Sequence, residues 1–437
     1  MCRGEGPSLT REVQLVNFRI SKGLRVPEKG VVKQVIDESA MVGRAALTSA
    51  DMPGLRPFLE VELEETVRVG DIVLRDRRRP EIAFAAPLSG RVSAIEIGPR
   101  RTLSALIIEV DADRDNDSAK PPLGMDTTAT TTAIPEVLLA CGLWPAFRTR
   151  PFGTIPAPEA IPDAIVVNAV SGSPLAPDPR VVVADRPDAF LSGLTALTRL
   201  SHGPVYLCQD PGAALIERLP EGVEAAVFSG TSAAGLAGTQ INRLCRAGPR
   251  RKVWSVGYQD VIAIGHLLDT GDYLAERVIS VAGPRATRPR LIRSILGTDL
   301  RALAATETTS NPATACTILS GDPLTGHAAD FLGRYHHQVT LTDPMHPAGQ
   351  ASGLHSRLVQ RSALTPLRGL ERAIAIDVLP VPLMRALSVG DAEAAERLGC
   401  LELIEEDVAA LSLLCTSGAD YGHLLREVLD QLAEKAA

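Results

Sequence analysis

The chain has 437 residues, of which 45% are hydrophobic, and a formal net charge of −7 at pH 7. This length exceeds that of an ordinary domain, so we expect roughly two to four folded units. The acidic balance argues against a nucleic-acid binder held by a general positive field, and the apolar fraction excludes disorder of the whole chain.

The cysteines are dispersed, and none is close enough to another to form a CxxC pair. This spacing is not that of an iron–sulfur or zinc site, and it predicts no metal. The N-terminal residues lack the apolar core of a signal peptide, and no apolar stretch approaches the roughly 20 residues of a membrane span. We therefore expect a cytoplasmic chain. The seven cysteines are Cys2, Cys141, Cys208, Cys245, Cys316, Cys400 and Cys415.

Residues 55–110 predict a compact unit of short strands separated by polar turns. The pattern is similar to the flattened barrel of biotinyl and lipoyl carrier domains, in which a lysine at a hairpin tip carries the cofactor as an amide. No lysine occurs between Lys33 and Lys120, and the tip reads Asp76-Arg77-Arg78-Arg79. An arginine cannot form that amide, so we predict a carrier fold without a carried group. The expected strands are 60–66, 72–74, 82–86 and 91–97.

Beyond a polar linker, short aliphatic runs alternate with helical patterns. Such alternation favours an open, mainly parallel α/β sheet of the Rossmann-like kind. The expected strands are 164–170, 181–184, 205–208 and 225–228, and the expected helices are 189–200, 211–219 and 235–245.

The third unit predicts strands at 276–281 and 290–295, a helix at 300–305, and strands at 315–319 and 338–341. This order is typical of a β-grasp module of the SLBB-like kind, and short helices follow it. The fold class is thus a multi-domain α/β and α+β protein. We expect the divisions to be an N-terminal extension (1–20), the carrier-like barrel-sandwich hybrid (21–112), a linker (113–133), the Rossmann-like domain (134–251), the β-grasp module (252–343), and an irregular loop with C-terminal helices (344–437).

Ordered blocks along most of the chain resemble the A subunit of the sodium-translocating NADH:quinone reductase of bacterial membranes. The layout is also similar to the flavin-binding subunit of complex I and to the C subunit of the Rnf complex. Those relatives bind their cofactors through a Gly-rich flavin loop or clustered cysteines, and this sequence contains neither feature. The carrying blocks are FRTRPF (147–152), NAVSGSPLAPDP (168–179), GLTALTR (193–199), GLAGT (235–239), WSVGYQDVIA (254–263), RVISVAGP (277–284), PRLIR (289–293), FLGRY (331–335), IDVLP (376–380) and LGCLELIEED (398–407).

The resemblance implies a peripheral subunit on the cytoplasmic face of the inner membrane. Its complex passes electrons from NADH to ubiquinone and exports sodium ions. It also implies that the flavins, the iron–sulfur cluster and the NADH site belong to other subunits, so that this chain holds no cofactor and no catalytic residue. Its partners would be the other subunits of the complex, especially a membrane-embedded one, and ubiquinone.

Three departures from the family pattern stand out, the first of which is the N-terminal extension. Gln240 and Asn242 occupy positions where the family pattern leads us to expect two histidines, and the loop around 344–369 is shortened. Two other functions stay open. The chain could be a stand-alone oxidoreductase that binds a flavin or nucleotide, or a pure assembly scaffold.

The first candidate for a quinone or partner contact is a group of aromatic and cationic residues within nine positions. A quinone needs a flat apolar slot together with donors that face its carbonyl oxygens. The alternative is an inter-domain hinge whose arginines pair with acids. The group comprises Trp144, Phe147, Arg148, Arg150 and Phe152.

Three further features are weaker candidates. Trp254, Tyr258 and Asp260 precede an apolar helical segment, and a buried, satisfied core cluster is preferred over a binding site as their explanation. The glycine-bearing loop 229–239 follows a strand and precedes a helix, but it is neither GxGxxG nor a Walker loop, so a tight turn is preferred over a mononucleotide site. His336 and His337 lack a third ligand and are predicted to be a surface pair.

Overall fold

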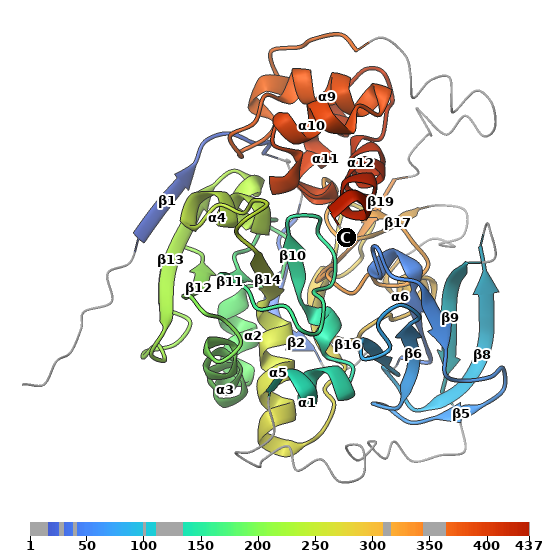
Figure 1. Ribbon diagram of the computed structural model, residues 1–437. Coiled ribbons are helices and arrows are strands. Elements are labelled where there is room, and N and C mark those ends of the chain that lie inside the picture. Colours follow the sequence, from blue (N-terminus) through green and yellow to red (C-terminus); the bar gives the residue numbers. More distant parts are fainter. Residues whose placement is uncertain are drawn as a thin grey trace, which may run out of the picture.

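The structure, a computed structural model, describes residues 16–25, 30–37, 42–98, 102–110, 134–308, 316–343 and 364–436. Figure 1 shows a small barrel, an α/β domain, a β-grasp module and a set of C-terminal helices gathered around the middle of the molecule. The predicted linker and most of the predicted irregular loop lie outside the described residues.

The barrel is formed by a four-stranded and a three-stranded antiparallel sheet that close on one apolar core. Val73, Leu74 and Leu106 are fully buried there. Of the predicted strand 60–66, only Thr66 is extended in the sheet, as the first residue of β5. The strands are β3 (Arg44–Thr48), β9 (Leu103–Glu109), β8 (Gly90–Ile97) and β5 (Thr66–Val67), then β4 (Pro57–Leu59), β6 (Ile72–Asp76) and β7 (Ala83–Ala85).

The α/β domain is a six-stranded sheet in which only β10 runs antiparallel. Ile165 and Val167 of β11 pack into the core that contains α3 and α5, while Ala164 and Val166 face the cluster that contains α4. Helices therefore cover both faces. The sheet order is β1 (Val16–Ile20), β13 (Val223–Gly230), β12 (Val205–Gln209), β11 (Ala164–Ala169), β14 (Val253–Gly257) and β10 (Arg148–Arg150), and the helices are α1 (Ile134–Ala140), α2 (Pro179–Asp185), α3 (Pro187–Thr198), α4 (Ala237–Leu244) and α5 (Tyr258–Thr270).

Two local predictions in this domain are wrong. Residues 181–184, predicted as a strand, lie in α2, because Asp178 accepts the N–H of Arg180 at 2.9 Å and Pro179 fits the first helical turn. Residues 211–219, predicted as a helix, form bends. The Arg180 side chain donates to the carbonyl oxygens of residues 210, 211 and 213, which stabilises the non-helical path.

The β-grasp module is a six-stranded mixed sheet with α6 (Leu300–Glu307) packed on it. Asp299 caps α6 by accepting the N–H groups of Arg301 and Ala302, as its sequence position predicts. The sheet order is β18 (His327–Ala328), β17 (Thr317–Ser320), β19 (Gln338–Thr342), β15 (Glu276–Ala282), β16 (Arg290–Ile295) and β2 (Lys33–Asp37).

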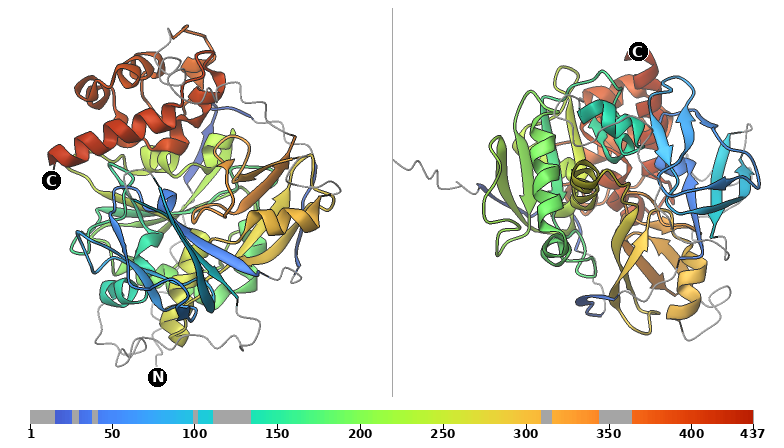
Figure 2. Two further views of the ribbon diagram at one scale, coloured as in Figure 1. Left: turned by 90° about the vertical axis from the view of Figure 1, so that its right-hand side faces the viewer. Right: turned by 90° about the horizontal axis from the view of Figure 1, so that it is seen from below.

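The C-terminal helices form a separate core, and Figure 2 shows them as a layer at one end of the molecule. They are α9 (Pro380–Val389), α10 (Ala392–Arg397), α11 (Glu405–Leu414) and α12 (Tyr421–Ala436). Among the residues with described positions, no helix is both long and apolar enough to span a bilayer.

The unit boundaries differ from the predicted divisions at two places. β14 pairs with β11 and is followed by α5, so the α/β domain extends beyond residue 251. The N-terminal strands leave the barrel altogether: β1 pairs with β13 of the α/β sheet, and β2 pairs with β16 of the β-grasp sheet. Edge strands supplied by a distant segment carry no local sequence signal, because pairing is set by tertiary contacts.

Candidate functional site

A cavity of about 390 Å³ lies where the α/β domain, the β-grasp module and the C-terminal helices meet. It is next to the carboxyl end of β11, the side on which open parallel sheets bind ligands. Its walls are the loops after β11 and β13, the segment between β17 and β19, and the first residues of α11. Polar and aromatic lining residues include Asp51, Arg148, Asn168, Tyr258, Asp322, His327, Tyr335, His336, His337, Gln338, Glu405 and Glu406.

The glycines near β11 and β13 serve close packing of the two loops. A Cβ on Gly235 would lie 2.3 Å from the Cα of Gly172 and 2.6 Å from its nitrogen. The loop 229–239 is thus pressed against its neighbour at Gly235, and the tight-turn interpretation of its glycines fits this geometry.

Three of the residues that line the cavity are neutral hydrogen-bonding groups. Tyr258 is 5% exposed, and its ring contacts that of His337 edge to face at 5.4 Å between centroids. His336 Nδ1 lies 2.8 Å from the hydroxyl of Ser320. Burial lowers the pKa of His336 to about 3 and that of His337 to about 4, and it raises the pKa of the Tyr258 phenol. At neutral pH these three side chains therefore carry no charge.

Arg148 brings a positive charge to the cavity wall. Its guanidinium stacks on the ring of Tyr335 at 5.1 Å, donates to the carbonyl of Gly153, and lies 3.6 Å from Glu405. The hydroxyl of Tyr335 donates to the carbonyl of Pro145, which fixes the ring under the cation. Arg148 is therefore held by contacts with three different segments.

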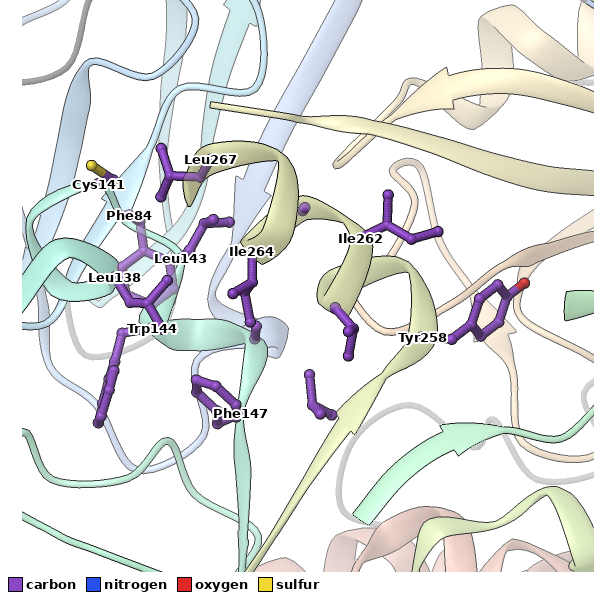
Figure 3. Packing of buried hydrophobic residues seen from close by; sticks show 14 of the residues in the cluster. Phe84, Leu138, Cys141, Leu143, Trp144, Phe147, Tyr258, Ile262, Ile264 and Leu267 are labelled. Carbon is purple, nitrogen blue, oxygen red and sulfur yellow. The ribbon is translucent and has the colours of Figure 1, made fainter. Parts of the chain in front are cut away.

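The other members of the predicted 144–152 group are separated from this cavity. Trp144 and Phe147 pack with Trp254 in the core, with centroids 5.3–5.6 Å apart, and the indole of Trp144 already donates to Pro156. Figure 3 shows Trp144 and Phe147 inside this packed cluster, and Tyr258 pointing away from them at the start of α5. Phe152 packs against the C-terminal helical core.

Arg150 and Asp260 take part in buried ionic contacts. Arg150 is 0% exposed and lies 3.5 Å from Asp407 of α11. Asp260 contacts Arg277 at 2.6 Å and Arg334 at 3.4 Å, which ties α5 to the β-grasp module. Of the eight predicted side chains, only Arg148 and Tyr258 line the cavity.

Gln240 and Asn242 belong to α4, and both side chains are buried against its neighbours. Gln240 donates to Asn168 at 2.8 Å, and Asn168 donates to the carbonyl of Gly235, so this chain of amides holds the loops beside the cavity. Asn242 donates to Glu402 at 2.7 Å and thereby links α4 to the C-terminal helices. Neither residue lines the cavity.

The sequence did not identify Tyr335, His336 and His337 as site residues. The prediction of an exposed histidine pair is wrong, because both rings are half-buried. They precede β19, in a loop where strand alternation does not apply. Within the described part of the chain, no three His, Cys, Asp or Glu side chains converge in a way that could hold a metal ion.

Three family models match successive parts of the chain. They are described as the NqrA N-terminal barrel-sandwich hybrid domain (residues 18–111), the NqrA second alpha/beta domain (129–273) and the NQRA C-terminal domain (278–330). The third carries the label SLBB. These matches define the class: a multi-domain chain with a barrel-sandwich hybrid, an α/β domain and an SLBB module.

Relatives of nearly the same length identify the family. A protein of Pseudomonas aeruginosa, named as the A subunit of the Na(+)-translocating NADH-quinone reductase, is 37% identical, with 96% of this chain and 100% of the relative covered. Proteins of the same name from Actinobacillus pleuropneumoniae (35%; 95% and 99% covered) and Marinomonas (37%; 94% and 98% covered) are also similar. The chain belongs to the NqrA family, which supplies the A subunit of the Na⁺-translocating NADH–quinone reductase, an oxidoreductase translocase.

Proposed function

We propose that this chain works as the A subunit of a Na⁺-translocating NADH–quinone reductase, with the other subunits of that complex as partners. Its place would be the cytoplasmic face of the membrane, docked on a membrane-embedded subunit. The relatives cover nearly the whole chain, which supports a role in the complete complex. In this proposal NADH, flavins and iron–sulfur chemistry belong to other subunits.

We further propose that the cavity beside β11 holds the head group of ubiquinone. The observation that carries this proposal is the set of neutral donors around one cavity: Tyr258, His336 and His337. An oxidised quinone is uncharged and offers two carbonyl acceptors, so uncharged donors match it without an unpaired buried charge. The volume, about 390 Å³, is within the range of small-molecule sites.

The proposed contacts follow from the lining. The phenol of Tyr258 and a ring N–H of His336 or His337 are the donors for carbonyl oxygens. The stacked pair of Arg148 and Tyr335 offers a flat surface in the cavity wall. Within the 144–152 group, this assigns the quinone contact to Arg148, while Trp144 and Phe147 support it from the core.

The test is equilibrium dialysis of the purified full-length chain against ubiquinone-1. Tyr258→Phe removes one donor and keeps the ring, so we expect affinity to fall about 3- to 10-fold. Tyr206→Phe, a half-buried tyrosine on β12 away from the cavity, is the matched control and should bind like wild type.

Three results would oppose the proposal. Equal affinity of Tyr258→Phe and wild type would remove the cavity as the quinone site. Failure of every variant to bind ubiquinone-1 would favour the scaffold role. A flavin absorption band in the purified chain would favour the stand-alone oxidoreductase.

A further inference from the structure

Five charged side chains join β10 to the beginning of α11, and we call them the β10–α11 charge cluster. Arg148 lies 3.6 Å from Glu405, and Arg150 lies 3.7 Å from Glu406 and 3.5 Å from Asp407. The first two residues of α11 and Arg148 also line the cavity. The cluster is therefore part of the cavity wall and part of the interface between two units.

The deepest pair of the cluster is incompletely satisfied. Arg150 is 0% and Asp407 3% exposed, yet Nε and Nη2 of Arg150 and Oδ1 of Asp407 have no hydrogen-bond partner within the described residues. Desolvation of such a pair can exceed its Coulombic attraction unless hydrogen bonds complete it. This contact therefore holds the interface less firmly than a fully bonded pair would.

The other contacts across this interface combine apolar packing, by Leu24, Phe152 and Leu324 on the C-terminal helical core, with polar contacts. Arg426 donates to the carbonyl of Phe152 at 2.8 Å, and the amide of Gly23 donates to the carbonyl of Arg372 at 2.7 Å. A small apolar cavity lies along this interface, which we call the seam. Its lining includes Leu236, Leu324 and Ala410. The seam continues from the larger cavity, because Leu236 and Leu324 line both.

We propose that the C-terminal helices form a movable wall of the cavity, and that closing the wall takes up one proton on Asp407 while opening it releases that proton to solvent. The ligand that the wall admits is the quinone only if the proposed function holds. The wall and its proton linkage do not depend on that identity.

The direction of the pH dependence follows from burial. In the closed wall, burial raises the pKa of Asp407 to about 7 from its ordinary 3.8, despite the opposing charge of Arg150. Exposure on opening returns the carboxyl to its ordinary range. Between these two values the closed state binds more protons, so each rise of one pH unit should increase the opening equilibrium about tenfold from pH 5 to pH 7.

The charged groups around Asp407 support this assignment. Arg150 and Arg148 of β10 lower its pKa, whereas Glu406 of its own helix raises it, and the N–H of Ile404 donates to it. The element on the other side, α4, approaches with Gly238, where a Cβ would lie 2.3 Å from Oδ1.

Glu405 does not compete in this pH window. Its pKa is lowered to about 2. Its bidentate hydrogen bond with Arg426 lies within the C-terminal helices, so opening of the wall leaves that bond intact. Its titration therefore falls outside the range in which Asp407 changes charge.

Hydrogen exchange of the Gly23 amide tests the proposal, because that amide bonds across the seam. Exchange is compared between wild type and Asp407→Asn at each pH, so the intrinsic pH dependence of exchange cancels in the ratio. We expect the wild-type to variant ratio to rise about tenfold per pH unit from pH 5 to pH 7, then to level off. Asp377→Asn, an exposed partner of Arg246 across the same interface, should keep the wild-type slope.

A flat ratio would overturn the proton linkage, as would an Asp377→Asn variant that loses the slope. Because the experiment contains no quinone, its outcome is separate from that of the proposed function. Repeating it with saturating ubiquinone-1 then asks whether the ligand slows opening. Unchanged exchange would leave the wall in place and count against quinone in this cavity.

Discussion

Removing the carboxylate of Asp260 should destabilise the junction between α5 and the β-grasp module. Its side chain is 3% exposed and contacts Arg277 (1% exposed) at 2.6 Å and Arg334 (7%) at 3.4 Å. Asp260→Asn keeps the volume but removes the carboxylate that forms the ion pairs of these two buried arginines. Breaking a buried pair in this way costs about 3–5 kcal/mol.

The assay is urea unfolding followed by tryptophan fluorescence. Trp144 and Trp254 lie together in the core beside α5, so both report on the unit that Asp260 holds. The control is Asp330→Asn, which breaks an exposed pair with Arg301 and should cost about 0–1 kcal/mol. Equal losses in the two variants would refute the claim that burial, rather than the ion pair itself, sets the magnitude.

Three further outcomes are expected from unfolding measurements. Gly265→Ala should lower the free energy of unfolding by about 1–3 kcal/mol or more, since the new Cβ would lie 1.8 Å from a carbonyl oxygen of α3. Gly248→Ala places its Cβ in open space, so the free energy of unfolding should change little. Asp299→Ala should lose about 1 kcal/mol of unfolding free energy with the cap of α6, and a loss below measurement error would contradict the capping role. Because folding lowers the pKa of His336 and His337 from 6.5 to about 3 and 4, the unfolded chain binds more protons below pH 6.5. Their contribution to stability should therefore be complete above pH 6.5 and decline as the pH falls toward 4, and His336→Gln should reduce that slope.

Much of the architecture was accessible from sequence because its signals are local. Aliphatic runs such as 164–170 have no polar face, which is typical of strands buried on both sides, and β11 lies there. The absence of an attachment lysine in the barrel can also be predicted from sequence, because an arginine cannot form the amide that holds a carried cofactor. The strand predicted at 181–184 is wrong because three valines favour a strand, while the capping contact of Asp178 favours a helix.

The site was only partly accessible. Clustered aromatic and cationic residues at 144–152 indicated an unusual segment, but the sequence does not say which side chain faces a core and which a cavity. Arg148 faces the cavity, whereas Trp144 faces the core. His336 and His337 reach the cavity from a loop more than 160 residues from β11, so no spacing rule joins them.

The pairing of β1 has a consequence for synthesis. Its partner β13 begins about 200 residues later in the chain, so the strand leaves the ribosome long before its hydrogen bonds can form. At elongation rates of about 5–20 residues per second, that interval is roughly 10–40 s. During translation, Val16–Ile20 is therefore an unpaired β segment to which a holding chaperone would bind. A fragment that starts after this segment would instead expose the edge of β13.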